Sequence, residues 1–395
     1  TTFYTGLVNK TLHHRVVSTT ICLLILGGTV GIFRLVPGGF VPPEDQGYLI
    51  SALTLPDGAS LQRTIAAGHR YQSAISQDPA VDWALSISGN DIIGGGIKTN
   101  AGTMFIPLKH WDQREATADD LIKKFSMIGK TLPDGLALVF NPPSIRGLGA
   151  AGGFEAYIQA RGDSNPQALA TVTQNFLDTL KKHPELATVN TFFRPTSPQL
   201  YVEVNEAKAI AMGVAVTDVY RTLQATIGTL YINDFNIDGR TYRVQLQADA
   251  AYRASPEDIG KVYVRAANGA LIPVSALITV RSLVGPELLE RFNGFLAAKV
   301  MGTALPQVST GDTIKIVDDV ARETLPAGYE LAWTGQAYQE KLTGGTSAIA
   351  FVFGIVMVFL ILAAQYERWS LPLAVIMAVP FAPFGSLFFL PFRGL

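Results

Sequence analysis

Three adjacent glycines followed by a lysine and a threonine form the first segment whose residue types could do chemistry. The segment is Gly94-Gly95-Gly96-Ile97-Lys98-Thr99. A phosphate-binding loop needs Gly, four residues, then Gly-Lys-Ser/Thr without a gap, because the lysine reaches the phosphates from a helix start. Gly89 and Gly94 have the right separation, but Gly95 stands where the lysine is required. The residues that follow also lack helical periodicity, so we do not expect nucleotide binding.

No arrangement of histidines or cysteines points to a metal centre. The histidines show no metal-ligand spacing and lie at His13, His14, His69, His110 and His183. The single cysteine, Cys22, lies in an apolar run, so we expect neither a zinc site nor a disulfide. A Ser/His/Asp triad stays open, but no Gly-x-Ser-x-Gly elbow is present. An enzyme is therefore our most distant hypothesis, and we expect no bound cofactor.

The composition favours a membrane protein over a nucleic-acid-binding one. Of the 395 residues, 48% are hydrophobic and only 16% are charged, against about a quarter in soluble proteins. The formal net charge is −1, so no basic surplus is available to neutralise phosphates. We do not expect nucleic acid as a partner.

Apolar residues are concentrated in runs at 16–33, 348–364 and 371–392, none of which holds a charged residue inside its apolar core. Each run is close to the ~20 residues that a helix needs to cross a bilayer. Buried core helices are the alternative, but several such runs together favour transmembrane helices. We predict these at 16–36, 345–364 and 370–392.

The charges beside the runs predict an orientation. Basic residues lie in the amphipathic lead-in 1–15, whereas Glu44 and Asp45 follow the first run. The positive-inside rule then places the N-terminus in the cytoplasm. The turn at 365–369 is too short to hold a domain, so the residues from 34 to 347 form one extracytoplasmic block. Because the chain lacks an initiator methionine and stops just after an apolar run, we interpret it as a segment of a larger polypeptide.

The outer block opens with a β-α-β-β-α-β pattern over 41–146. Apolar alternation predicts strands at 48–55, 81–87, 103–109 and 136–140, and helical spacing predicts a helix at 60–77. Thr117 with Asp120 predicts the capped start of a second helix. This order is that of the split βαβ, or ferredoxin-like, unit.

The same pattern then returns, interrupted by an insertion. Strands are predicted at 154–160, 187–193, 295–302 and 329–334, with helices at 166–183 and from Thr310. The second unit therefore comprises 147–193 and 294–337, and residues 194–293 form the insertion. Within the insertion, 233–240 has turn chemistry and 241–247 alternates like a strand. The predicted fold class is an α+β membrane protein with transmembrane helices and two tandem βαββαβ subdomains, the second interrupted.

The glycine run falls between the second and third strands of the first unit, so it is a loop between strands. Its glycines permit positive φ, and Ile92, Ile93 and Ile97 flank them. A surface excursion would leave these large apolar side chains in water. We favour a hinged gate over an apolar cavity.

Several motifs resemble the resistance–nodulation–division (RND) superfamily, and most closely its hydrophobe/amphiphile multidrug efflux pumps. They are FVPPEDQG at 40–47, Asn233-Asp234-Phe235 with Gly239-Arg240, WTG at 333–335 with YQE at 338–340, and FRGL at 392–395. The resemblance covers the whole chain and implies the middle of the C-terminal half, from the seventh to the ninth span. It implies that the two units are porter subdomains PC1 and PC2 and that the insertion belongs to the funnel or docking domain.

The resemblance also implies roles for individual residues. The switch loop corresponds to Gly89, Ile92, Ile93, Gly94, Gly95, Gly96 and Ile97. Deep-pocket positions are Leu85, Ile87 and Phe105. Access-pocket positions are Leu136, Leu138, Phe140, Pro142, Asn190, Phe192 and Met301. The docking or intersubunit loop corresponds to Asn233, Asp234, Phe235, Gly239 and Arg240. Leu85 and Leu138 stand where well-known members carry phenylalanine, and Asn190 where they carry a basic residue. For Ile87 and Leu136, ordinary core packing is the alternative.

As a whole, the resemblance implies a homotrimeric drug:proton antiporter in the inner membrane of Gram-negative bacteria, with a large periplasmic portion. Its partners would be a periplasmic adaptor, an outer-membrane channel and hydrophobic or amphiphilic drugs. The apolar runs at 16–33, 348–364 and 371–392 hold no acidic or basic residue to carry protons, so the proton motive force would act through residues outside this segment. Residues 340–347 would couple the second unit to the next span by a coil-to-helix change. An RND exporter of lipid or another non-drug substrate and a non-transporting membrane receptor remain alternatives.

Overall fold

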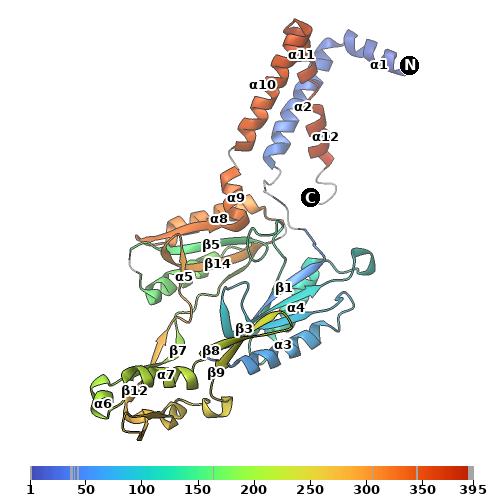
Figure 1. The fold of residues 1–395 in the computed structure, drawn as a ribbon. Coiled ribbons are helices and arrows are strands. Elements are labelled where there is room, and N and C mark those ends of the chain that lie inside the picture. The colour runs from blue at the N-terminus through green and yellow to red at the C-terminus, as the bar shows by residue number, and fades with distance from the viewer. Residues whose placement is uncertain are drawn as a thin grey trace. The chain divides into compact units, whose positions relative to one another are not determined.

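The computed structural model describes residues 2–35, 39, 41, 44–162, 164–305, 307–343 and 346–389. These residues form a mixed α+β fold, as expected (Figure 1). The chain divides into two compact units: Thr1–Phe193 with Leu288–Leu395, and Arg194–Glu287. The motif residues Phe40, Pro42, Pro43 and 392–395 lie outside the described residues.

The first sheet of the larger unit is four-stranded, with the order β2-β3-β1-β4. Its strands are β1 (Tyr48–Thr54), β2 (Leu85–Asn90), β3 (Ile97–Pro107) and β4 (Leu136–Phe140). Helices α3 (Leu61–Ile75) and α4 (Ala118–Lys130) bury a core against one face of this sheet, with Leu49 and Ile106 packed beneath Tyr71 and Phe125. Between β3 and α4 lies the short η1 helix (Trp111–Gln113).

Local sequence signals fix where these two helices begin. Ser60 accepts a hydrogen bond from the backbone N–H of Arg63 at the start of α3. Thr117 and Asp120 form the capping box predicted for α4. The start of α4 predicted from the sequence is confirmed.

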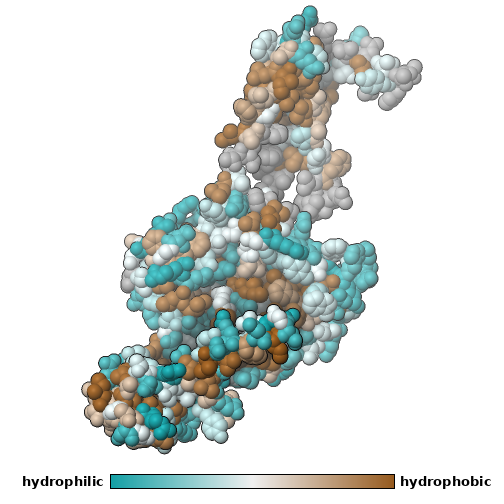
Figure 2. All heavy atoms as spheres, in the orientation of Figure 1, coloured by the Kyte–Doolittle hydropathy of each residue, from teal (hydrophilic) through white to brown (hydrophobic). Residues whose placement is uncertain are grey.

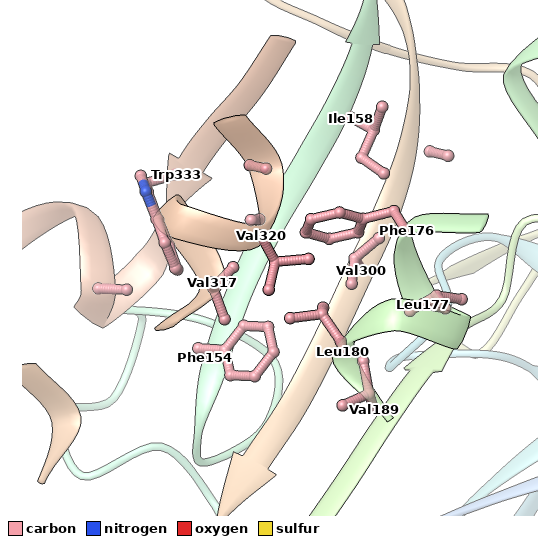
Figure 3. Packing of buried hydrophobic residues seen from close by; sticks show 14 of the residues in the cluster. Phe154, Ile158, Phe176, Leu177, Leu180, Val189, Val300, Val317, Val320 and Trp333 are labelled. Atoms are coloured by element: carbon pink, nitrogen blue, oxygen red, sulfur yellow. The ribbon is translucent and has the colours of Figure 1, made fainter. Parts of the chain in front are cut away.

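The second sheet has the order β13-β14-β5-β15, and β6 also pairs with β14. Its strands are β5 (Phe154–Ala160), β6 (Leu186–Thr191), β13 (Glu290–Phe292), β14 (Phe295–Ala304) and β15 (Tyr329–Thr334). Helices α5 (Pro166–Leu180) and α8 (Thr310–Thr324) cover one face. Figure 3 shows Phe154, Phe176 and Val317 meeting in this core.

Two predicted strands of the first unit, 81–87 and 103–109, have different bounds in the structure. Residues 81–84 are not part of a strand, and Val81 forms only an isolated bridge with Leu108. Instead β2 runs to Asn90 and β3 begins at Ile97, and the two pair as far as Asn90 opposite Ile97. The polar stretch after Ile97 forms a strand because the hairpin ladder satisfies its backbone groups. The glycine loop is therefore the tight hairpin tip 91–96.

The smaller unit holds two antiparallel strand pairs of some length. Strands β7 (Ser197–Val204) and β12 (Ile278–Gly285) pair along their whole length, and β8 (Leu230–Ile237) pairs with β9 (Arg240–Leu246). Its other elements are α6 (Glu206–Ala211), α7 (Val216–Thr226), η2 (Ala250–Tyr252), η3 (Pro256–Lys261), β10 (Tyr263–Arg265), β11 (Leu271–Pro273) and η4 (Val274–Ala276). The predicted turn at 233–240 is wrong in extent. Only Asp238 and Gly239, with φ of 51° and 73°, form the turn, as two-residue hairpin loops require.

The remaining helices are α1 (Thr2–His13), α2 (Arg15–Leu35), α9 (Gly335–Thr343), α10 (Thr346–Tyr366), α11 (Ser370–Ile376) and α12 (Phe381–Phe389). Among the described residues, one segment is long and apolar enough to cross a membrane: Ser370–Phe389, which a turn divides into α11 and α12. Val16–Thr29 and Val352–Tyr366 are shorter apolar helices. Figure 2 shows hydrophobic residues over α10. The other two predicted spans stay predictions.

The connection to α10 is helical on both sides of residues 344 and 345, and the predicted coil-to-helix change over 340–347 stays a prediction. Glu340 already lies in α9, which continues to Thr343. Gly344 and Gly345 lie outside the described residues.

Candidate functional site

The helix-free face of the first sheet carries the predicted pocket residues of both kinds. Directly opposed residues of neighbouring strands point to the same face. Leu85 lies opposite Phe105, Phe105 opposite Ile50, and Ile50 opposite Phe140, so these four form one row across the sheet. The next rows contain Ile87, Leu138 and Leu136. The register therefore places the deep-pocket and access-pocket positions of this sheet on one surface.

Part of this surface is buried in a cluster that joins the two sheets. We call it the junction cluster; it comprises Ile50, Ala52, Ile93, Phe140, Ala151 and Met301, with Tyr48, Phe105, Leu138, Ala150 and Phe192 packed against it. Its members come from the first sheet, the glycine loop, the connection between the sheets, and β14. Side chains far apart in sequence thus share one apolar contact.

Other predicted pocket positions lie at the margin of this cluster. Leu85 is 47% exposed and Leu136 is 40% exposed, which excludes simple core packing for Leu136. Ile87 is half-buried, and Pro142 is buried beyond the end of β4. Asn190 is half-buried opposite Met301 in the second sheet.

The three isoleucines near the glycines differ in burial. Ile93 is fully buried in the junction cluster, whereas Ile92 is 40% and Ile97 is 90% exposed. Gly89 belongs to β2 and Ile97 begins β3. The prediction that residues 89–97 all lie in a loop is wrong at both ends, because β2 extends to Asn90 and β3 begins at Ile97. Ile93 alone connects the hairpin tip to the cluster.

Asp91 organises the hairpin tip. Its buried carboxylate accepts the Gly94 N–H at 2.7 Å and pairs with the Lys98 ammonium at 3.0 Å. The Asp91 N–H donates to the Gly96 carbonyl, and the Gly95 N–H donates to the Asp91 carbonyl. Sequence analysis missed this role of Asp91, although aspartate three residues before glycine is a common turn signal.

The glycines of the tip are needed for two different reasons. Gly95 and Gly96 both have φ of +87°, a conformation that residues with a side chain rarely adopt. At Gly94 the limit is space, because an added Cβ would lie 2.4 Å from Asp91 Oδ2 and 2.7 Å from Phe192 Cβ.

The helix-free face of the second sheet is polar. Glu155, only 5% exposed, accepts the N–H groups of Ala150 and Ala151 at 2.7 and 3.1 Å, and its other oxygen lies 3.1 Å from Lys299 Nζ. Lys299 Nζ also donates to the Ile93 carbonyl at 3.3 Å. Sequence analysis missed these residues. The alternation of Phe154-Glu155-Ala156-Tyr157-Ile158-Gln159 indicates such a polar face.

The same face continues through paired side chains. The Tyr157 hydroxyl donates to Glu290 at 2.6 Å, and its ring stacks on Phe292 with centroids 4.3 Å apart. Burial, followed by the hydrogen bond to Glu290, raises the pKa of Tyr157 above its ordinary value. Gln159 donates to the Phe292 carbonyl and accepts from Arg161. Each of these groups has a partner inside the sheet.

In the smaller unit, the β8–β9 hairpin exposes almost every side chain. The predicted docking residues Asn233, Asp234 and Phe235 lie in β8, Gly239 in the turn, and Arg240 in β9. Phe235 stacks on Tyr242 at 5.5 Å. Other large hydrophobic residues at least 41% exposed here are Tyr231, Ile232, Ile237, Val244 and Leu246. A two-stranded hairpin is marginally stable in water by itself.

Among the described residues, no three His, Cys, Asp or Glu side chains gather in a way that could hold a metal ion.

Comparison with known proteins gives the class of this chain. Residues 1–395 match the model of the AcrB/AcrD/AcrF family. The chain therefore belongs to this family, which lies within the RND superfamily.

Its relatives are named as multidrug export, toluene efflux and multidrug resistance proteins. The chain is 34% identical over 388 residues to multidrug export protein AcrF of Escherichia coli strain K12, covering 97% of this chain and 37% of AcrF. It is 34% identical to the toluene efflux pump membrane transporter TtgB of Pseudomonas putida strain DOT-T1E, covering 94% and 36%. Multidrug resistance protein MdtF of Escherichia coli O157:H7 is 33% identical, with 95% and 36% covered. The chain thus spans little more than a third of the length of these relatives.

Proposed function

We propose that this chain is part of an inner-membrane transporter of Gram-negative bacteria that exports hydrophobic and amphiphilic compounds by proton antiport. Family membership and the names of the relatives support this function. The observation that carries it is the junction cluster, where Ile93 of a glycine hairpin lies against apolar side chains of both sheets.

In this proposal the two sheets are the porter subdomains, 41–146 as PC1 and 147–193 with 294–337 as PC2. The shared strand order supports a tandem origin. In the first sheet the last strand pairs with the first, the first with the third, and the third with the second. The second sheet repeats this order when β5, β6, β14 and β15 are numbered in turn. The insertion at 194–293 would be the docking subdomain.

The apolar face of the first sheet would bind substrate, with the hairpin tip as its gate. Burying one large apolar side chain contributes about 1.5–3 kcal/mol. A few such contacts approach the ~8 kcal/mol of micromolar binding without any directional bond. Withdrawal of Ile93 would open this surface to a substrate. Because such binding requires no hydrogen bond of fixed geometry, the same surface could bind chemically varied amphiphiles.

The exposed β8–β9 hairpin would dock in a neighbouring copy of the protein, giving a homotrimer. The assembled transporter would contact a periplasmic adaptor and an outer-membrane channel. The proton motive force would enter through residues outside this segment, and the apolar helices would lie in the bilayer.

The test is drug accumulation in a pump-deletion strain that carries the full-length gene. Phe105→Ala removes a half-buried ring beside the junction cluster, and we expect severalfold more dye or drug to accumulate. Phe295→Ala, a 37% exposed ring on β14 outside the cluster, is the matched control and should leave export unchanged. Equal membrane abundance is checked by immunoblot. If neither variant changes accumulation of any compound, the pocket assignment is wrong.

A further inference from the structure

Lys299 links the gate to the second sheet. Its Nζ lies 3.1 Å from Glu155 Oε2 and donates to the Ile93 carbonyl at 3.3 Å. The two charged side chains are only 13% and 6% exposed. A hydrogen bond from a charged donor in such a protected place is stronger than one on the surface.

The hydrogen bond from Lys299 to Ile93 connects the hairpin tip to the other sheet, unlike the other hydrogen bonds at the tip. Asp91 closes the tip on itself through Gly94, Gly95 and Gly96, and the Ile92 N–H donates to Thr103 of β3. These bonds join the tip only to itself and to the first sheet, so they would move with the tip. The Lys299 bond instead joins the tip to β14.

Glu155 keeps the lysine in place. One of its oxygens accepts the Ala150 and Ala151 N–H groups, and the other faces Lys299. The ammonium is thereby oriented before it meets the Ile93 carbonyl. Met301, on the same face of β14 two residues further on, packs in the cluster that contains Ile93. A polar and an apolar contact with Ile93 therefore lie next to each other on one strand.

We propose that Lys299 is the positioning residue that holds the hairpin tip closed. Its ammonium fixes the backbone of Ile93 while Met301 and Phe140 hold the side chain. Opening requires Ile93 to leave both contacts, so Lys299 sets how often the tip opens. The meaning of this opening for transport rests on the gate function proposed above, but the holding of the tip is measured separately.

Amide hydrogen exchange of the purified full-length protein tests this role. In Lys299→Met, the peptide covering 91–96 should exchange about tenfold faster, since a hydrogen bond from a charged group is lost. Peptides from α6 and α7 of the smaller unit, which contains neither Lys299 nor Glu155, should keep their wild-type rates. Lys299→Arg, which retains a charged donor, should restore most of the protection. Lys181→Met, which removes a lysine from an exposed pair with Asp178, is the matched control.

Two further variants separate the hydrogen bond from the ion pair. Glu155→Gln keeps an acceptor for the backbone and leaves the lysine donor, so the tip should remain protected. Lys299→Met combined with Glu155→Gln leaves no unpaired buried charge, yet the tip should still exchange fast. Wild-type exchange at 91–96 in Lys299→Met, or protection restored in the double variant, would overturn the proposal. A loss of export with unchanged tip exchange would reject Lys299 as the residue that holds the tip.

Discussion

The two sheets of the larger unit have the same strand order, but the faces that carry no helices differ in chemical character. On the first sheet this face is apolar, with Phe105, Ile50 and Phe140 in one row. On the second it carries Glu155, Tyr157, Gln159 and Lys299, all in hydrogen bonds or ion pairs within the unit. The helix-covered faces, in contrast, are apolar in both sheets.

The difference shows what topology determines and what it leaves open. Strand order fixes which alternate positions face away from the helices. The residue types at those positions then decide whether the face is apolar or carries polar groups that bond to one another. An apolar face must be covered by something, and here Ile93 covers part of it. A paired polar face can hold its neighbours in defined places, as Glu155 holds Ala150 and Ala151.

The largest loss of stability is expected when a buried side chain of the apolar face is truncated. Phe140→Ala removes a ring that is 5% exposed and should lower the free energy of unfolding by about 3–4 kcal/mol. Leu85→Ala, in the same row but 47% exposed, should cost less than about 1 kcal/mol. Thermal unfolding of the detergent-solubilised full-length protein measures both. Equal losses would mean that burial does not distinguish the centre of this face from its edge.

The polar face should depend on pairing rather than on burial. Lys299→Met leaves Glu155 as an unpaired buried charge, and we expect a loss of about 3 kcal/mol in stability. Adding Glu155→Gln removes that charge and should recover most of the loss. The same melting experiment completes the double-mutant cycle. A double variant as unstable as the single one would contradict the idea that pairing holds this face.

The hairpin tip that covers the apolar face should be sensitive at one glycine more than at its neighbour. Gly94→Ala forces a Cβ against Asp91 and Phe192 and should cost roughly 2 kcal/mol. Gly95→Ala meets open space but adopts φ of +87°, so about 1 kcal/mol is expected. Melting temperatures of the two variants give the order. If Gly95→Ala is the more harmful, space beside Phe192 is not the constraint.

The smallest effect concerns Tyr157 and is seen best at high pH. Tyr157→Phe keeps the stack on Phe292 but loses the bond to Glu290, at a cost of about 1 kcal/mol. Because the pKa of Tyr157 is raised in the folded protein, its neutral form is preferred there. Its share of stability is present below the ordinary pKa of 10.0 and is lost as the pH rises above it. Wild type should therefore lose more stability than Tyr157→Phe between about pH 9 and pH 11. Parallel alkaline unfolding curves would contradict this.

Features encoded by neighbouring residues could be predicted from the sequence. The Thr117–Asp120 capping box starts α4 as expected, and strands β4, β5 and β15 have the predicted bounds. Each depends on a local signal: a cap for α4, a short apolar run for β4, and apolar residues at alternate positions of β5 and β15. The boundary of β2 could not be predicted, because Gly89 and Asn90 are weak strand formers and the strand extends over them only through the pairing of Ser88 and Asn90 with β3.

The candidate site depended on contacts that no local pattern contains. The sequence suggested pocket positions on the strands, but the register that puts Leu85 and Phe140 in one row comes from pairing across β3 and β1. The bond between Lys299 and the Ile93 carbonyl joins residues 206 positions apart. Ile93 and Ile97 are chemically identical, and only the tertiary fold buries one and exposes the other.

The smaller unit interrupts the chain between β6 and β13, yet its own ends meet. Ser197 at the start of β7 pairs with Gly285 at the end of β12. The hydrogen bonds between β7 and β12 thus hold the two ends of this long insertion close together. The second sheet therefore loses less conformational entropy on pairing the strands that flank the insertion than it would if the insertion were an open loop of the same length. In evolution, such a self-closed insert can be lengthened, shortened or exchanged for another while the strands on either side keep their partners.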